Sequence, residues 1–349
     1  MPPLRLAVDA RVIAEDTRGI GRYARAVLRR LVLRDDIELT LLADGPFASR
    51  RRAAYARALG NANFIVRGRV PKSADLVWHP ANGTFFASAR PAVATIHDAV
   101  PFRFPAADPQ RREHAQLPFL RSARTAARVI AVSRFGRDEV HAMLGVPLER
   151  VEIIPHGVEP AFAPGEAEPL PAALRGLRYL LFVGDPIGEP RKNFDLLYSA
   201  YRQAWHDDAP LLAVAGPRAP DLPGVLHLGD LGDDLVADRS EALRACYRGA
   251  IAVTMASYHE TFGMPMLEAM ACGTPVIASH ASSLPEIGGD AALYEPPDDA
   301  AAWAAGLRRI VADADLRERL RAAGLERVEQ FSWDRSAQHH ADLFCSVAA

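Results

Sequence analysis

HETFGMPMLEAMACGTPV, residues 259–276, is the stretch that decides the fold prediction for this chain. It follows a short apolar run, residues 251–255, that reads as a buried strand. Gly263 permits a sharp bend, Pro265 suits the first helical position, and Gly273 suits the stop just after the last turn. The sequence therefore predicts a strand, a glycine turn and a short helix in direct succession.

This turn carries groups suited to a nucleotide sugar. A helix N-terminus exposes unpaired N–H groups and a partial positive charge, which together can seat a phosphate. Glu268, one turn into the helix, can accept two adjacent hydroxyls, as on a ribose, and Glu260, before the bend, can reach a second hydroxylated group. Spacing alone does not establish the site, because Glu318 and Glu326 lie equally far apart in an ordinary helical stretch.

The segment resembles the E-x7-E signature of the retaining family-4 glycosyltransferases, which have the GT-B fold. The following TPVIASHASSLPEI, residues 274–287, is similar to that family's next strand and loop. The resemblance implies that Glu268 holds the ribose and that Glu260 holds the hydroxyls of the donor sugar. It also implies donor contacts from the residues that open the helix: Phe262, Gly263, Met264 and Pro265.

A second segment, FVGDPIGEPRKNFDLL at residues 182–197, supplies positive charge. A strand is expected to end near Gly184, and Lys192 at the start of the next helix can neutralise a diphosphate leaving group. EPRKNFDLL resembles the family's diphosphate-binding segment, with Lys192 at the expected lysine. The family's arginine six residues earlier is replaced here by Pro186, and Arg191 is the candidate for its role.

In the first half of the chain, ATIHDAVPFRFP at residues 94–105 sets His97 at the carboxyl end of a strand. A lone histidine is more often structural than catalytic. The segment resembles the family's HD-x-x-P region, whose histidine faces the transferred sugar. Asp98, next to it, and His79, at the end of the preceding strand, are candidates for the acceptor side.

Gly19 and Gly21 lie in GIGRYARAVLRRL, after the first strand and before an expected helix. A G-x-G alone is a weak nucleotide signal, and the third glycine of a dinucleotide fingerprint is missing. The segment resembles the family's first loop and helix, which implies that these glycines let the backbone approach the donor phosphates or the acceptor.

Short apolar runs alternate with helical patterns along the chain, which favours parallel sheets with helices on both faces. The expected strands are 4–8, 39–43, 64–66, 76–78, 92–96 and 129–132 in a first series, then 179–183, 211–215, 225–228, 251–255, 276–278 and 292–294. A break rich in proline and acidic residues, 160–171, separates the two series.

We therefore predict an α/β protein with two Rossmann-like domains whose strand ends face a central cleft. The first, residues 1–158, is expected to bind the acceptor, and the second, residues 159–332, the nucleotide-sugar donor. Residues 333–349 read as an amphipathic helix. The resemblance to the GT-B fold implies that this last helix crosses back to the first domain.

The net charge of −2 hides a strong asymmetry between the two halves. Residues 1–150 hold 25 Lys and Arg against 14 Asp and Glu, a balance of +11, and the remainder carries −13. The basic half could dock on anionic lipid or hold an anionic acceptor, and a solvated arginine-rich surface is the alternative. Nucleic-acid binding is not expected, because no aromatic residues interleave with the basic ones.

No segment reaches 18 apolar residues without a charge, and the start of the chain lacks a signal-peptide pattern. We expect a cytoplasmic protein, with peripheral contact at the inner face of the cytoplasmic membrane as an open addition. Its three cysteines form no C-x-x-C pair and read as reduced. No metal or other cofactor is expected, because no ligand cluster has metal spacing and the D-x-D at residues 313–315 reads as a solvated turn.

Together these features predict a metal-independent retaining glycosyltransferase, with His97, Glu260 and Lys192 as its catalytic candidates. Mannose carried by GDP is the preferred donor, and the expected partner is a glycan or lipid-linked acceptor in polysaccharide, lipopolysaccharide or glycolipid assembly. Two other classes stay open: a non-catalytic nucleotide-sugar-binding partner protein and a GT-B epimerase. The presence of only two lysines, Lys72 and Lys192, disfavours a pyridoxal-phosphate phosphorylase. A NAD-dependent oxidoreductase is disfavoured because the segment with Gly19 and Gly21 lacks the third glycine of the dinucleotide-binding motif.

Overall fold

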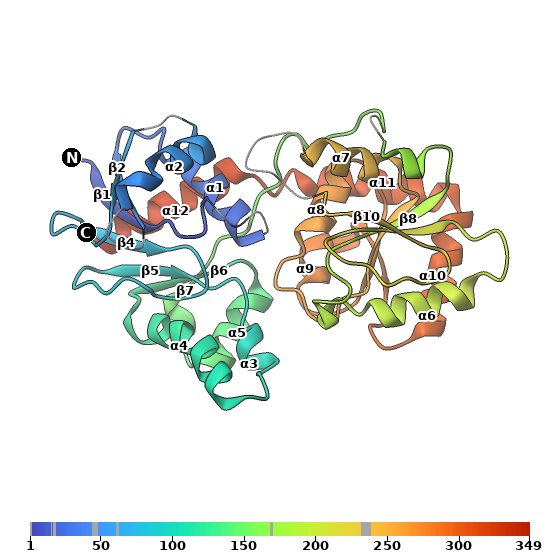
Figure 1. Cartoon of the computed structure of the whole chain (residues 1–349), viewed down its shortest axis with the longest axis horizontal. Helices are drawn as coiled ribbons and strands as arrows, with labels where there is room; N and C mark the ends of the chain where they lie inside the picture. The colour runs from blue at the N-terminus through green and yellow to red at the C-terminus, as the bar shows by residue number, and fades with distance from the viewer. Residues whose placement is uncertain are drawn as a thin grey trace. The chain divides into compact units, whose positions relative to one another are not determined.

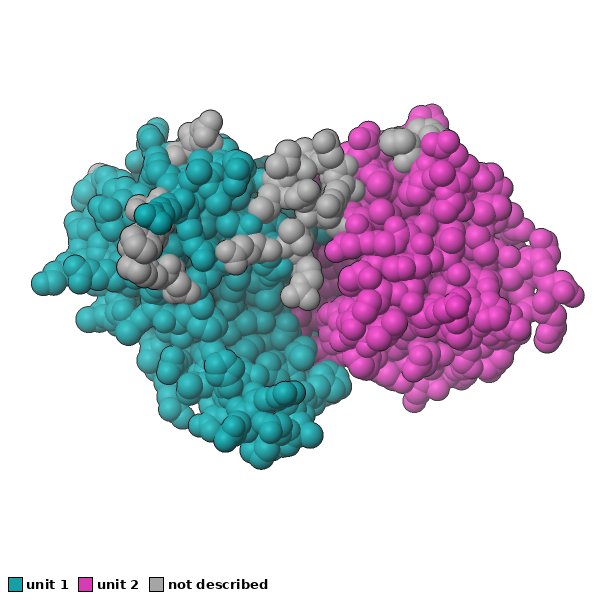
Figure 2. All heavy atoms as spheres, in the orientation of Figure 1, with its two compact units in different colours: residues 1–157, 333–349 teal, residues 158–332 magenta. Residues whose placement is uncertain are grey.

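The computed structural model describes residues 2–14, 16, 19–43, 48–60, 63–167, 170–231 and 239–349. The chain divides into two compact units (Figure 2): unit 1 is Met1–Gly157 with Trp333–Ala349, and unit 2 is Val158–Ser332. Each unit contains one parallel β-sheet with helices packed against it (Figure 1). Two Rossmann-like α/β domains are thus confirmed.

The sheet of unit 1 has seven strands in the order β3-β2-β1-β4-β5-β6-β7, and every neighbouring pair is parallel. The strands are β1 (Leu4–Asp9), β2 (Ile37–Leu42), β3 (Phe64–Arg67), β4 (Leu76–His79), β5 (Ala92–Thr95), β6 (Arg128–Ala131) and β7 (Val151–Ile153). The chain winds outward from β1 to β3 and then returns to β4 beside β1. Ligands in open α/β sheets bind where the strand order reverses in this way, at the carboxyl ends of the strands.

The sheet of unit 2 has six strands in the order β10-β9-β8-β11-β12-β13, again all parallel. They are β8 (Tyr179–Val183), β9 (Leu211–Ala215), β10 (Val225–Gly229), β11 (Ala252–Met255), β12 (Val276–Ser279) and β13 (Leu293–Glu295). The reversal falls between β8 and β11, so the loops after these two strands are where a ligand is expected in this unit. β8 and β11 lie at the centre of this sheet and are buried almost throughout, which is typical of a parallel sheet with helices on both faces.

Helices connect the strands in both units. Those of unit 1 are α1 (Gly19–Leu31), α2 (Arg52–Leu59), α3 (Val100–Arg103), α4 (Pro109–Thr125) and α5 (Arg134–Leu144), with 3₁₀ turns η1 (Ala48–Arg51) and η2 (Leu148–Arg150). Those of unit 2 are α6 (Phe194–Ala204), α7 (Arg239–Gly249), α8 (Met264–Ala271), α9 (Leu284–Gly288), α10 (Ala300–Ala312) and α11 (Ala314–Val328), with 3₁₀ turns η3 (Ala172–Leu174), η4 (Pro190–Lys192) and η5 (Gly289–Ala291).

The last helix, α12 (Trp333–Ala348), belongs to unit 1 although it follows unit 2 in the chain. It packs on α1 and β4, and its Phe344 ring lies 5.3 Å from that of Trp78, centroid to centroid. The expected return of the C-terminal helix to the first domain is confirmed.

All twelve expected strands are present, with ends shifted by at most two residues. Among the described residues, one strand was missed: β7, a three-residue strand at the edge of the sheet of unit 1. Within the break predicted at residues 160–171, Phe162 is buried, with its ring 5.9 Å from that of Tyr247. This part of the segment therefore packs against unit 2 and is not only a linker.

Candidate functional site

The strand–turn–helix that opened the sequence analysis lies between β11 and α8. Gly263 has a φ of +87°, which a side chain would strain, and a Cβ there would lie 2.9 Å from Leu284 Cδ2. The helix begins at Met264, so Pro265 is its second residue and not its first as expected. Gly273, with a φ of +74°, follows the helix end as expected. The backbone amides at the start of α8 thus follow a turn that only glycine accommodates well.

Lys192, Arg191 and Glu260 form one ion-pair cluster at the ends of β8 and β11. The Lys192 Nζ lies 3.0 Å from Glu260 Oε1, and the Arg191 Nη1 lies 3.0 Å from Glu260 Oε2. Arg191 also donates to the His259 carbonyl oxygen at 3.0 Å and pairs with Glu189 at 2.7 Å. One carboxylate therefore holds two cations from a segment 68 residues earlier in the chain.

The electrostatics of this cluster keep Glu260 ionised. Burial alone would raise its pKa, but the charges and hydrogen bonds of Lys192 and Arg191 lower it to about 2. Glycine at position 184 makes room for the cluster, since a Cβ there would lie 2.6 Å from Lys192 Cε. Four of the residues proposed from the sequence, Gly184, Arg191, Lys192 and Glu260, therefore lie together in the structure, and their roles toward a donor stay a prediction.

Three serines that the sequence analysis did not single out hold Glu260. Ser257 donates to its Oε1 at 3.1 Å, Ser282 Oγ accepts from its amide at 2.9 Å, and Ser283 donates to its carbonyl oxygen at 2.8 Å. Ser282 and Ser283 follow β12 in the HASSLPEI segment, so their place after a strand end was the available signal. Glu260 is thus fixed in both backbone and side chain.

Glu268 lies in α8 and is 3% exposed. Its Oε2 accepts a hydrogen bond from the Tyr247 hydroxyl at 2.8 Å, and Tyr247 belongs to α7. This tyrosine is a second contributor that the sequence did not reveal. Phe262, expected to contact the donor, is buried and packs edge-on against Phe331 with ring centroids 5.9 Å apart.

In unit 1, His97 follows β5 and is held in one orientation. Its Nε2 lies 2.8 Å from the Pro80 carbonyl oxygen, and its backbone amide donates to Asn82 Oδ1 at 2.6 Å. A carbonyl can only accept, so Nε2 carries the proton and the neutral ring presents Nδ1 as an acceptor. Burial lowers the pKa of His97, which keeps this neutral form.

Asp98 has local hydrogen bonds. Its Oδ1 accepts from the Val100 amide at 3.1 Å, and its Oδ2 accepts from Asn82 at 3.4 Å. His79 ends β4 and is buried, with Nδ1 3.8 Å from Asp9 Oδ2, and Asp9 forms a bidentate pair with Arg11. The two acceptor-side candidates therefore lie after neighbouring strand ends of one sheet, as expected from their order in the chain.

The two glycines of the first loop differ from expectation. Gly19 and Gly21 lie in the first turn of α1, not in a loop before it. A Cβ on Gly21 would lie 1.9 Å from the Asp16 carbonyl oxygen, so this glycine allows a close approach of the chain's own backbone.

A buried hydrogen-bond chain links α12 to the sheet of unit 1. The His340 Nδ1 lies 2.7 Å from the Ser336 carbonyl oxygen, so Nδ1 carries the proton and Nε2 accepts from the Tyr23 hydroxyl at 2.6 Å. Tyr23 in turn accepts from Thr95 Oγ1 at 3.0 Å, which accepts from Trp78 Nε1 at 3.0 Å. The Tyr23 ring lies edge-on to His97, with centroids 4.6 Å apart.

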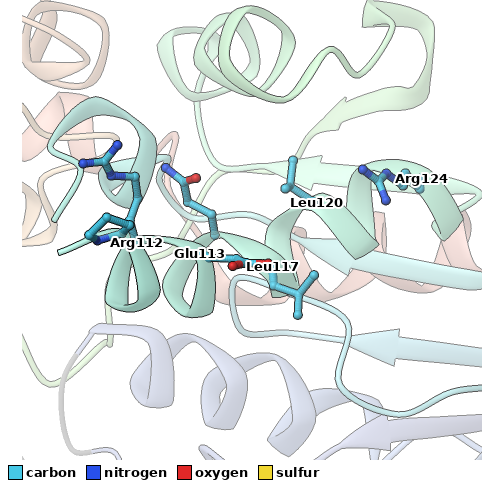
Figure 3. Close-up of a pocket in the computed structure, with 7 residues that line it drawn as sticks. Arg112, Glu113, Leu117, Leu120 and Arg124 are labelled. Carbon is cyan, nitrogen blue, oxygen red and sulfur yellow. The ribbon is translucent and has the colours of Figure 1, made fainter. Parts of the chain in front are cut away.

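A hollow also lies along α4 in unit 1 (Figure 3), and none of the predicted site residues lines it. Its lining is Pro109, Arg112, Glu113, Gln116, Leu117, Leu120 and Arg124.

Among the described residues, no cluster of three or more His, Cys, Asp or Glu has a geometry that could hold a metal ion. Asp313 of the D-x-D segment caps α11 through the Leu316 amide, at 2.8 Å.

Comparison with known proteins identifies both halves of the chain. The profile of Glycosyltransferase Family 4 matches residues 17–162, and that of Glycosyl transferases group 1 matches residues 175–327. The chain belongs to glycosyltransferase family 4. This glycosyltransferase is 28% identical to O-antigen chain mannosyltransferase B of Escherichia coli, across 90% of this chain and 93% of the relative.

This glycosyltransferase is also 32% identical to D-inositol 3-phosphate glycosyltransferase of Streptomyces bingchenggensis, across 64% of the chain but only 53% of that relative. Among solved structures, its fold is similar to sucrose-phosphate synthase from Thermosynechococcus elongatus, with a TM-score of 0.71, 20% identity and 99% of each chain covered. It is similarly close to HepE from Anabaena in complex with UDP and glucose, with a TM-score of 0.71, 16% identity, and 98% and 100% covered. These likenesses confirm the GT-B fold.

Proposed function

We propose that this glycosyltransferase moves mannose from GDP-mannose to an acceptor hydroxyl with retention of configuration. The observation that carries the proposal is the cluster of Lys192, Arg191 and Glu260 beside the start of α8. It brings two cations to one carboxylate at the strand ends where such folds bind ligands, and the N-terminus of α8 begins four residues after Glu260 in the chain. The relative named as an O-antigen chain mannosyltransferase supports mannose as the sugar. The acceptor that we propose is a glycan or lipid-linked glycan in polysaccharide, lipopolysaccharide or glycolipid assembly.

Each donor-side residue has a part in this proposal. Lys192 and Arg191, with the amides of Gly263 and Met264, stabilise the charge that develops on the departing diphosphate. Glu260 accepts hydroxyls of the sugar, and Glu268 accepts those of the ribose. Because these cations and the helix N-terminus neutralise the diphosphate, transfer requires neither a metal ion nor a cofactor.

The reaction proceeds on one face of the sugar. The bond between the anomeric carbon and the diphosphate oxygen breaks, the acceptor oxygen bonds to the same face, and the acceptor's proton passes to a diphosphate oxygen. His97 stays neutral and orients the acceptor through Nδ1. In this proposal His79 and Asp98 also serve acceptor binding. Gly19 and Gly21 serve the binding of either the donor phosphates or the acceptor.

The test begins with thermal-shift binding of GDP, UDP, ADP and dTDP, which identifies the nucleotide. Transfer from GDP-mannose to a lipid-linked glycan is then measured with and without EDTA, and the anomeric configuration of the product is read by NMR. GDP release that does not need an acceptor would indicate an epimerase or hydrolase, and binding without turnover would indicate a non-catalytic partner protein. Loss of transfer in EDTA, restored by Mg²⁺, would contradict the metal-independent part.

Peripheral contact with an anionic membrane is a separate part of the proposal. Leu117 on α4 is 37% exposed, and Phe104, directly after α3, is 49% exposed. Arg112 and Arg124 lie along the same hollow as Leu117 (Figure 3), which suits anionic headgroups with apolar chains beneath them. Co-sedimentation with phosphatidylglycerol vesicles but not phosphatidylcholine vesicles, weakened by Leu117→Asp, is expected, and equal behaviour with both lipids would support a merely solvated surface. None of the helices that the structure describes has both the length and the apolar composition that a membrane-spanning segment needs.

A further inference from the structure

Arg218 is an arginine of unit 2 that the donor site has not used. It lies just after β9, the strand next to β8, and so at the same edge of the sheet as Gly184 and Lys192. The ends of these strands touch, because the Gly184 amide donates to the Ala215 carbonyl oxygen at 2.9 Å. We infer that Arg218 binds the diphosphate of the nucleotide sugar and that Asp185 holds it in position; this inference rests on the donor site proposed above.

The first support is the way Arg218 is oriented. Its Nη2 and Nε lie 2.5 Å and 3.1 Å from Asp185 Oδ2. The other carboxylate oxygen of Asp185 accepts the amides of Ile187 and Gly188, at 3.1 Å and 2.8 Å. Asp185 therefore orders its own loop and fixes the guanidinium from the neighbouring strand at the same time.

The second support is that donors remain for a ligand. The contacts of Arg218 to Asp185 use Nε and Nη2, and Nη1 donates to no other residue that the structure describes. The side chain is 54% exposed, although its direction is fixed. A guanidinium held by a carboxylate on one side keeps its remaining N–H groups for a phosphate oxygen.

The third support is charge. Lys192 and Arg191 are both already paired with Glu260, so their charge is partly offset before a diphosphate is counted. Asp185 adds a further negative charge beside Gly184, and alone it would repel a phosphate. Arg218 offsets that charge. Loss of Arg218 would therefore remove a hydrogen-bond donor to the phosphate and also leave the Asp185 carboxylate without its neutralising partner.

Gly188 connects this pair to the loop backbone. A Cβ on Gly188 would lie 1.8 Å from Arg218 Nη2 and 2.3 Å from Asp185 Oδ2. The residue does not have a positive φ, so alanine fits its backbone and acts only by displacing the ion pair. Gly188→Ala therefore moves Arg218 while leaving both charges in the protein.

The experiment is calorimetric titration with the diphosphate that binds best among GDP, UDP, ADP and dTDP, and with its monophosphate. Arg218→Ala is expected to weaken diphosphate binding at least tenfold and monophosphate binding less than threefold. Gly188→Ala is expected to give the same pattern with a smaller loss. Arg178→Ala is the matched control, since its pair with Asp208 is exposed at the opposite end of β8, and it should bind as the wild type does.

The outcomes separate this inference from the proposed function. If the wild type binds none of the four diphosphates, the donor site itself is wrong. If it binds one of them and Arg218→Ala changes affinity less than twofold, or weakens both nucleotides equally, the assignment of Arg218 fails while the donor site stands. If Asp185→Asn combined with Arg218→Ala restores wild-type affinity, Arg218 only neutralises Asp185 and binds no phosphate, which also overturns the inference.

Discussion

Glu260 Oε1 lies 3.0 Å from Lys192 Nζ, so the two residues to which we assign the donor sugar and its leaving diphosphate form an ion pair with each other. A group that stabilises the leaving phosphate is thereby tied to a group that orients the sugar. Removing either side chain leaves the charge of the other without this partner. Substitution of Glu260 and substitution of Lys192 should therefore have opposite electrostatic effects on the binding of a nucleoside diphosphate.

Glu260→Ala removes the carboxylate that lies 3.0 Å from both cations and leaves Glu189, 2.7 Å from Arg191 Nη2 and 3.9 Å from Lys192 Nζ, as their remaining shared carboxylate. We expect nucleoside-diphosphate affinity to stay level or rise while sugar transfer falls more than tenfold, a barrier change of about 1.4 kcal/mol or more. Lys192→Ala should reduce both quantities, because Glu260 then repels the diphosphate. Steady-state kinetics and calorimetry check both variants. Glu318→Ala, which removes an exposed glutamate on α11, is the control and should be near neutral.

Tyr247→Phe removes the hydroxyl that donates to Glu268 at 2.8 Å. Because a buried carboxylate loses one hydrogen bond, the free energy of unfolding should fall by about 1 to 3 kcal/mol. The KM for the nucleotide sugar should rise severalfold while kcat changes little, since a ribose contact is equally strong in the ground state and the transition state. A fall in kcat with an unchanged KM would contradict the ribose assignment of Glu268.

The rate of sugar transfer should not fall as the pH is lowered through the ordinary pKa of histidine, because His97 stays neutral there. Burial lowers the pKa of this ring, so the neutral form that presents Nδ1 persists below pH 6.5. We expect kcat to be flat from pH 8 to 6 and His97→Gln to lower it more than tenfold, although glutamine can still reach the Pro80 carbonyl oxygen. A wild-type profile that halves at pH 6.5, with the same profile in His97→Gln, would show that another group titrates.

The stability of the protein should fall in acid through His340. Burial lowers its pKa to about 4, whereas an unfolded histidine titrates near 6.5. The unfolded state therefore takes up the extra proton as the pH falls from 6.5 toward 4, and stability is lost in that window. At pH 5 the loss from this residue is about 2 kcal/mol.

Urea unfolding at pH 7 and pH 5 measures this effect. The difference between the two pH values should shrink by about 2 kcal/mol in His340→Gln, because glutamine does not titrate. His206→Gln, at an exposed position just after α6, should keep the wild-type difference. An unchanged difference in His340→Gln would remove His340 as the cause.

The sequence predicted the parts of this protein that local rules control. The alternating strands, the bend at Gly263 and the stop at Gly273 follow from backbone preferences over a few residues, and their positions agree with the structure. The proximity of Lys192 to Glu260 was also predictable, because both follow neighbouring strands of a parallel sheet.

Contacts that depend on the tertiary arrangement were not predictable. Tyr247 reaches Glu268 from another helix, and Arg218 reaches Asp185 from another strand, with no spacing or motif that signals either pair. Pro186 drew attention to a missing arginine in the loop after β8, whereas the structure has an arginine arriving from outside that loop. A single sequence does not show such substitutions across strands.

The return of α12 to unit 1 sets an order of events during synthesis. Unit 2 occupies residues 158–332, so all of it is translated before the helix that covers Trp78 and Tyr23 exists. At about 5 to 20 residues per second, that interval lasts roughly 10 to 35 seconds. The unit made first is therefore the unit completed last, and its apolar α12-binding face is exposed on the ribosome while its neighbour folds.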